Sequence, residues 1–282
     1  MAAFLRSPRA APWVLLAPSL ALLAVFFLYP LGDMLARSLY DPTFTWKHYA
    51  RLIEEPTYLQ VLWITFEIAL SVTACALVLG YPLAYFLSQV KPRTAGLLMI
   101  LVVVPYFTSV LVRTYAWMVL LGTEGIVNQL LMASGLIKAP LAMMYTRFGV
   151  LVGMTYILLP YMVLALYSVM RGIDTGLLRA AESLGASRRR AFWHVFAPLS
   201  MPGVAAGSLL VFILSIGFFI TPALMGSQED SMISMIIESQ VETYFDWGFA
   251  SALATVLLAC TLVLFLVYER LVGLNRLFEA KL

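Results

Sequence analysis

The stretch DTGLLRAAESLGASRRRAFWHVFAP, residues 174–198, is the longest charged passage between strongly apolar blocks of this sequence. Three of its apolar residues, Leu177, Ala181 and Leu184, recur with the spacing of a single helix face. Gly185 follows directly, at the position where such a helix often ends. The pattern predicts a short amphipathic helix rather than a slack linker.

A second short helix is predicted after the glycine. Asp174 or Thr175 is suited to cap the first helix, and Ser187 is suited to cap the segment SRRRAFWHVF. Pro198 is expected to close the passage. Two short helices that meet at Gly185 are typical of a docking surface.

The composition is that of a membrane protein. Apolar residues make up 62% of the 282 residues and charged residues only 12%, whereas an average soluble domain is about half apolar and about a quarter charged. The net charge of +3 is small, and the one arginine cluster adjoins apolar blocks, which argues against nucleic-acid binding. Cys75 and Cys260 lie inside apolar blocks without a neighbouring Cys or His, so neither a disulfide nor a metal site is expected.

Six apolar blocks are long enough to span a hydrocarbon core of ~30 Å, which takes about 20 helical residues. The first block is predicted to be an uncleaved spanning helix, because it is too long for a signal peptide and no small-residue cleavage pattern follows it. Prolines in four later blocks predict kinks, at Pro82, Pro105, Pro160 and Pro222. The blocks run approximately over residues 13–31, 60–89, 95–121, 147–170, 200–225 and 247–273.

The distribution of Lys and Arg orients these spans, because cytoplasmic loops carry the excess of positive charge. With the N-terminus inside, twelve of the 18 basic residues fall on the cytoplasmic side, so both termini are predicted to be cytoplasmic. The passage 174–198 then lies in the cytoplasm as well. The twelve are Arg6, Arg9, Lys91, Arg93, Arg171, Arg179, Arg188, Arg189, Arg190, Arg270, Arg276 and Lys281.

Two of the predicted outer connections carry structure of their own. Residues 125–137 mix apolar and small polar side chains and predict a short helix that lies on the membrane. Residues 227–247 carry five acids and no Lys or Arg, and they are also expected to be helical. These acids indicate either a solvated face or a surface that meets a partner or attracts cations.

The 174–198 passage resembles the cytoplasmic EAA loop of ABC importer permeases. That family's pattern is Glu-Ala-Ala, then Gly after three further residues, then Ile-x-Leu-Pro after nine more. Ala180, Ala181, Gly185 and Pro198 match this pattern with its spacing intact. The departures are Arg179 for Glu, Val195 for Ile and Ala197 for Leu.

The resemblance extends to the spermidine/putrescine-type permeases, through the runs LVLGYPLAYFLS (77–88), VVVPYFTSVLVRTYAW (102–117) and TYILLPYMVLALYS (155–168). It implies an all-α, six-helix permease of the MetI-like fold in a bacterial inner membrane. Its N-terminal helix and first outer loop would occupy residues 1–59, its core 60–275 and its tail 276–282.

The resemblance also implies partners: a second similar permease, two ABC ATPase subunits, an external solute-binding protein and a small polar solute, most specifically a polyamine. ATP and magnesium would bind to the ATPases, and this sequence has no G-x-x-x-x-G-K-[ST] phosphate loop of its own. The run Arg188–Arg190 is expected to bind anionic membrane lipid, with contact to an ATPase as the alternative. The implied coupling residues are Leu177, Arg179, Ala180, Ala181, Leu184, Gly185 and Pro198.

Charges inside spanning blocks are costly and therefore mark candidate sites. Glu67 and Arg113 fall at comparable depths, about 10 Å from the outer surface by helical rise, so they are expected to be neighbours. Such a pair either holds two helices together or leaves Glu67 to attract an ammonium group, while Arg113 is suited to steer a carboxylate or phosphonate. Nearby aromatic rings can hold ammonium groups by cation–π contacts. The solute-pathway candidates are Glu67, Tyr106, Phe107, Arg113, Tyr115 and Trp117.

Other functions fit the sequence less well. A secondary transporter or channel working without ATP would not need the EAA spacing, and the sequence shows no inverted repeat and few ionisable residues in its spans. A membrane enzyme would need clustered His, Asp or Glu, whereas His48 and His194 are far in sequence from each other and from Glu67. Within the importer class, the alternative solutes are an opine, an amino acid derivative or an aminophosphonate.

Overall fold

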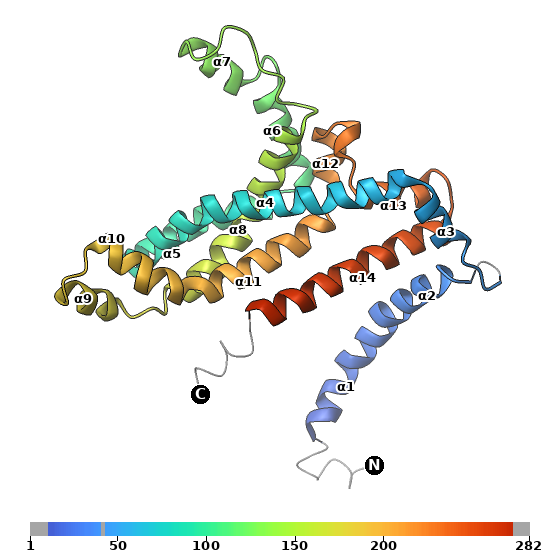
Figure 1. The fold of residues 1–282 in the computed structure, drawn as a ribbon, viewed down its shortest axis with the longest axis horizontal. Coiled ribbons are helices and arrows are strands. Elements are labelled where there is room, and N and C mark those ends of the chain that lie inside the picture. Colours follow the sequence, from blue (N-terminus) through green and yellow to red (C-terminus); the bar gives the residue numbers. More distant parts are fainter. Residues whose placement is uncertain (1–10, 41–42, 273–282) are drawn as a thin grey trace. The chain divides into compact units, whose positions relative to one another are not determined.

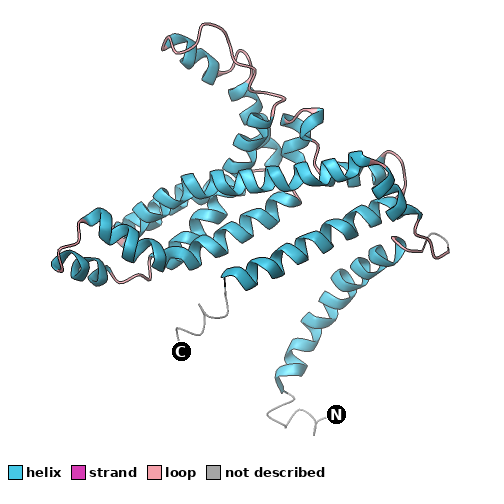
Figure 2. Ribbon diagram, in the orientation of Figure 1, coloured by secondary structure: helices cyan, strands magenta, loops and turns pink. Residues whose placement is uncertain are grey.

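The computed structural model describes residues 11–40 and 43–272. Every regular element in this part of the chain is a helix (Figure 2). Six helices are long and apolar enough to span a membrane, which confirms the predicted all-α class with six spans. The predicted tail 276–282 and the basic residues Arg6, Arg9, Arg276 and Lys281 lie outside the described residues.

The helices follow one another along the chain, most of them through short connections (Figure 1). Two π-helical turns (η2, η4) and two 3-10 turns (η3, η5) interrupt or join them. The bounds are α1 (Ala11–Leu23), η2 (Ala24–Leu28), α2 (Tyr29–Arg37), α3 (Lys47–Glu54), α4 (Pro56–Gln89), α5 (Pro92–Val103), η3 (Val104–Phe107), α6 (Val110–Leu121), α7 (Ile126–Ala133), α8 (Arg147–Met170), α9 (Thr175–Ser183), α10 (Arg188–Ala191), η4 (Phe192–Phe196), α11 (Ala197–Ile216), α12 (Ile220–Met225), η5 (Gln228–Asp230), α13 (Ile233–Glu242) and α14 (Trp247–Val272).

The chain forms two compact units. The first consists of residues 1–56 and 236–259, and the second of residues 57–235 and 260–282, as far as each is described. In the first unit the Arg51 guanidinium lies 4.3 Å from the centre of the Phe249 ring and 3.4 Å from the Asp246 carboxylate. These contacts hold α3 against the start of α14.

The central helix of the second unit is α8. Of its apolar window 61% is buried, against 39% in α4 and in the span that contains α11. α11 runs beside α8 (Figure 1), and a Cβ added at Gly203 would lie 3.1 Å from Val169 Cβ. A Cβ at Gly207 would lie 2.8 Å from Met162 Sδ and 3.2 Å from Ala165 Cβ. Small residues four apart let membrane helices approach closely, so these two glycines permit the α8–α11 contact.

The third apolar block, predicted as one helix over 95–121, is interrupted. α5 gives way to the 3-10 turn η3, and Thr108 and Ser109 then have ψ angles of 153° and 139°, outside the helical range. Pro105 lacks the N–H that a continuous helix would need at that position. The prediction of one continuous third helix is therefore wrong, and the third candidate span is Val110–Ala133.

The second helix of the 174–198 passage does not end at Pro198. It continues through the π turn η4 into α11, so the predicted end of that helix is wrong. In η4 the Ala197 N–H bonds to the Phe192 carbonyl five residues back. This wider turn gives room for a proline ring, which would clash with a carbonyl in a regular α-helix.

α11 ends at Ile216, and residues 217–219 separate it from α12, so the block predicted over 200–225 also contains a break. The two outer connections predicted to be helical contain α7 and α13, which confirms that prediction. Pro82 and Pro160 lie inside the uninterrupted helices α4 and α8.

Candidate functional site

The 174–198 passage folds as a capped corner between α9 and α10, at the left of Figure 1. Asp174 caps α9, because its Oδ1 accepts a hydrogen bond of 2.7 Å from the N–H two residues on. Gly185 has a φ of +90°, and its N–H and the next N–H bond back to carbonyls in the last turn of α9 at 3.0 Å. Ser187 caps α10 by accepting from the Arg190 N–H at 3.3 Å. The predicted caps and the predicted corner at Gly185 are confirmed.

One apolar side chain of α9 packs against the core, whereas other apolar side chains of this region are exposed. Leu178 packs against the core of the second unit, whereas Leu177 is 46% exposed and Leu184 is 89% exposed. Ala180 is also exposed, and Ala181 is half-buried. The corner thus presents an apolar edge with small residues beside it, a surface that suits a close-packed partner.

Three charged side chains of the corner, those of Arg179, Glu182 and Arg188, have partners within it. Arg179, at the position where related loops carry an acid, donates from Nη2 to Thr175 Oγ1 at 3.4 Å. Glu182 pairs with Arg188 at 3.7 Å across the corner. Pro198 is the second residue of α11 and lies on the continuation of the same helix. The corner therefore keeps a positive, exposed Arg179 beside its apolar edge.

Trp193, in the turn η4, is a surface residue of the same region that sequence reasoning missed. Its side chain is 61% exposed, while its neighbour Phe192 packs against Tyr85 and Phe196, with ring centres 5.2 and 5.8 Å away. The signal in the sequence was a tryptophan inside a charged passage next to a span. It enlarges the exposed apolar surface beyond α9.

Three of the predicted pathway residues lie together at the interruption of the third block. The rings of Tyr106 and Phe107, in η3, are 5.9 Å apart, and the Arg113 guanidinium lies 5.8 Å from the centre of the Tyr106 ring. Tyr161 of α8 meets Tyr106 edge-on at 5.4 Å. Arg113 itself is only 7% exposed, and its buried Nε has no hydrogen-bond partner.

The other two aromatic candidates lie apart from this cluster. Trp117 contacts Tyr156 with ring centres 5.3 Å apart, and both line an almost wholly apolar cavity of about 380 Å³ between α4, α6 and α8. Tyr115 is 53% exposed. The structure therefore does not gather all the predicted aromatic residues at one site.

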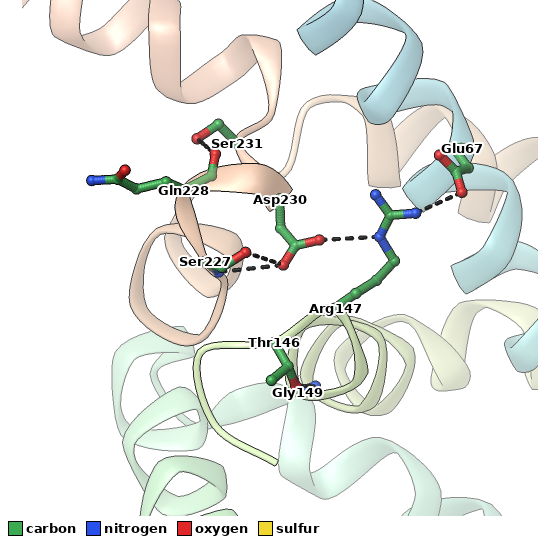
Figure 3. A network of polar contacts seen from close by, with 8 residues as sticks. All are labelled: Glu67, Thr146, Arg147, Gly149, Ser227, Gln228, Asp230 and Ser231. Carbon is green, nitrogen blue, oxygen red and sulfur yellow. Dashed lines mark hydrogen bonds and ion pairs between the residues drawn. The ribbon is translucent and has the colours of Figure 1, made fainter. Parts of the chain in front are cut away.

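Glu67 pairs with Arg147, not with Arg113. Arg147 Nη1 lies 2.6 Å from Glu67 Oε1, and Arg147 Nε lies 3.0 Å from Asp230 Oδ1 (Figure 3). The expected Glu67–Arg113 neighbourhood is wrong: Arg113 lies over the Tyr106 ring, and a similar depth in two helices does not bring their side chains together unless the helices pack with those faces against each other. Arg147, the first residue of α8, instead reaches Glu67 on α4.

Asp230 is the buried anchor of this network. Its side chain is 5% exposed, and its Oδ2 accepts from Ser227 Oγ at 2.7 Å and from the Ser227 N–H at 3.3 Å. Sequence reasoning treated Arg147 only as an outer basic residue and Asp230 as one of several outer acids. The local signal was the Ser-x-x-Asp spacing of a capping box at 227–230.

The sequence of the chain matches known proteins over most of its length. Residues 76–276 match the family described as "Binding-protein-dependent transport system inner membrane component". The chain is 37% identical over 267 residues to the spermidine/putrescine transport system permease protein PotB of Haemophilus influenzae, which covers 94% of this chain and 91% of that protein. It is 39% identical over 227 residues to the PotB of Escherichia coli, covering 80% of this chain and 82% of that protein.

The fold also matches a solved structure. The structure of a bacterial alginate ABC transporter in complex with an alginate pentasaccharide-bound periplasmic protein has a chain that aligns with a TM-score of 0.71 at 16% identity, covering 92% of this chain and 93% of that one. At this identity the likeness concerns the fold alone. The family match over residues 76–276, the 37% identity to a PotB permease and the six candidate spans show that the chain belongs to the family of binding-protein-dependent transport system inner membrane components, as a multi-pass ABC permease of the bacterial inner membrane.

Proposed function

We propose that this permease forms, with a second similar subunit, a pathway through which ATP hydrolysis in separate subunits drives the import of a polyamine. The observation that carries the proposal is the 37% identity, over 94% of the chain, to a spermidine/putrescine transport system permease. A solute-binding protein outside the membrane would deliver the solute. The periplasmic protein bound to the alginate transporter of similar fold supports this arrangement.

The corner between α9 and α10 is the proposed docking surface for an ATPase subunit, which would hold ATP and magnesium. Leu177, Leu184 and Trp193 expose apolar surface there, and burying it against a partner would release about 25 cal/mol for each Å² removed from water. The small residues Ala180 and Ala181 would allow close approach. Gly185 and the caps around it would keep the corner rigid enough to transmit force, while Arg188–Arg190 would meet anionic lipid.

The interruption around Thr108 and Ser109 is the part of the described chain that best fits a pathway lining. Backbone outside a helix is not tolerated against lipid tails, because its N–H and C=O groups find no partners there. Tyr106, Phe107, Thr108 and Ser109 are all exposed on the single chain. They would therefore face water in the pathway or the second permease, where the two rings suit ammonium groups by cation–π contacts worth about 0.5–2 kcal/mol.

The test is uptake by the complete complex. The chain would be affinity-purified with its partners, reconstituted in lipid vesicles and supplied with labelled spermidine or putrescine. We expect ATP-dependent uptake of the polyamine, and we expect that opines, amino acids and aminophosphonates do not inhibit this uptake. If no ATPase or second permease co-purifies and uptake persists after ATP depletion, the importer proposal is wrong. If an amino acid derivative enters and spermidine does not, the polyamine assignment is wrong.

A further inference from the structure

The ion-pair network of Figure 3 is strongly asymmetric. Asp230 is buried and fixed by both Ser227 contacts as well as by Arg147. Glu67 has a side chain 43% exposed, and its one contact in the network is the 2.6 Å bond from Arg147 Nη1. Half-exposed ion pairs are weak compared with a buried, multiply bonded carboxylate. If the network opens, it therefore opens between Glu67 and Arg147, and Arg147 stays with Asp230.

Opening would leave a carboxylate without its counter-charge. Two acids share one guanidinium, so Arg147 is neutralised by Asp230 alone once Glu67 is released. Glu67, whose side chain is 43% exposed, would then carry an uncompensated negative charge on the spanning helix α4, and this charge attracts a cation into the place of the guanidinium. The chemistry that replaces a guanidinium N–H donor is another cationic N–H donor, such as a primary ammonium.

The network lies where α4 meets the loop after α12, a boundary that we call the seam and that other contacts also cross. The loop that carries Asp230 is tied to α4 through the Ile233 N–H, which donates to the buried Thr65 Oγ1 at 2.8 Å. It is tied to the break after α11 through Ser234 Oγ, which donates to the Phe218 carbonyl at 2.6 Å. Movement of this loop relative to α4 would break the Ile233–Thr65 bond and, because Asp230 holds Arg147, would draw the guanidinium away from Glu67.

There is open space on the Arg147 side of this seam. A cavity of about 670 Å³ is lined by residues 145–147 and 227–230. Its charged lining residues are Arg147, Glu229 and Asp230, so the acids outnumber the base. A solute with several ammonium groups could approach the network through this cavity without meeting excess positive charge.

We propose that Arg147 is an internal counter-cation that occupies the place of a solute ammonium group on Glu67 and is displaced when a polyamine passes. This inference rests on the proposed function and adds to it a side chain, Arg147, that competes with the solute for Glu67. Glu67 is then both a structural pair, when Arg147 holds it, and a pathway residue, when Arg147 releases it. A purely structural ion pair would have no such second state.

The test compares the apparent KM for labelled spermidine in reconstituted complexes. Glu67→Gln keeps an oxygen acceptor but removes the negative charge that attracts an ammonium group, so it should raise KM. Removing Arg147 removes the competitor and should lower KM by about two- to five-fold, the range expected of a half-exposed ion pair. The double change R147Q/D230N is used, because Arg147→Gln alone would leave Asp230 buried and unpaired. In the triple variant with Glu67→Gln the lowering of KM should disappear.

Arg37→Gln is the control, because Arg37 and Asp33 form an exposed ion pair of similar length, 2.7 Å, within the single helix α2. It should leave KM unchanged. If R147Q/D230N raises KM as Glu67→Gln does, or if both variants lower only the thermal stability and the maximal rate, the pair is structural and the inference is wrong. Absence of polyamine uptake by the unmodified complex overturns the proposed function, and the inference with it.

Discussion

Replacing Gly185 by alanine is the sharpest test of the α9–α10 corner. Gly185 has a φ of +90°, and a Cβ there would meet no heavy atom within 4 Å. The substitution therefore adds no clash with neighbouring residues and acts on the backbone alone. An L-residue forced into the left-handed region costs about 1–2 kcal/mol, which lowers the ratio of ordered to disordered corner by about 5–30-fold.

Gly135 provides a control with the same chemistry in another place. It has a φ of +74°, ends α7 with the same pair of backbone hydrogen bonds, and also has open space at its Cβ position. Gly135→Ala should carry a similar cost without touching the proposed ATPase surface. Gly185→Asn should lie between wild type and Gly185→Ala, because asparagine tolerates the left-handed region better than alanine does.

The assay is ATP-dependent uptake by reconstituted complexes, together with the amount of ATPase that co-purifies with each variant. Gly185→Ala should lower both while membrane insertion stays normal, and Gly185→Val, with a branched Cβ, should lower them further. Gly135→Ala should leave ATPase recovery unchanged. Wild-type uptake and ATPase recovery in Gly185→Ala and Gly185→Val, or equal losses in Gly135→Ala, would refute the docking role of the corner.

Two predictions concern the packing that holds these sites. Gly207→Leu should destabilise the protein by about 1–3 kcal/mol through overpacking against α8, as measured by thermal unfolding in detergent. Gly96→Leu is the control and should not destabilise the protein, because a Cβ at Gly96 would meet nothing within 4 Å. Equal losses in the two variants would contradict the close α8–α11 contact. Thr65→Val should cost about 1–3 kcal/mol because it leaves the buried Ile233 N–H without an acceptor. Thr73→Val removes only a bond within α4 and should cost less, so a reversed order would count against the tie between the outer loop and α4.

Much of the fold could be predicted because it depends on residues close together in the chain. Six spans were expected and six candidate spans are found, although the third covers Val110–Ala133 and not one continuous helix over 95–121. The corner at 174–198 is equally local: Asp174 and Ser187 bond to N–H groups two or three residues away, and Gly185 accepts a φ that other residues resist. These effects depend on residues a few positions apart, so they can be predicted from the sequence.

The breaks in the spans were only partly visible in the sequence. Pro105 and Pro198 have the same chemistry, yet the helix stops around the first and continues through a π turn before the second. A proline removes one hydrogen bond in either case. Whether the helix is then interrupted or continues through a wider turn depends on what the neighbouring turns pack against. Phe192 and Phe196 are held against Tyr85 of α4, whereas Tyr106 and Phe107 are exposed.

The partner of Glu67 was decided only by tertiary structure. The sequence by itself determined that this chain crosses the membrane and carries a capped, glycine-hinged corner in the EAA spacing, because helix length, caps and hinge each depend on a few adjacent residues. It also placed Glu67 in a span. That Arg147 meets both Glu67 and Asp230, which lie 80 and 83 residues from it along the chain, follows from how α4, α8 and the loop after α12 pack together. Charges pair with whichever opposite charge the packing brings within reach, and no local pattern encodes that distance.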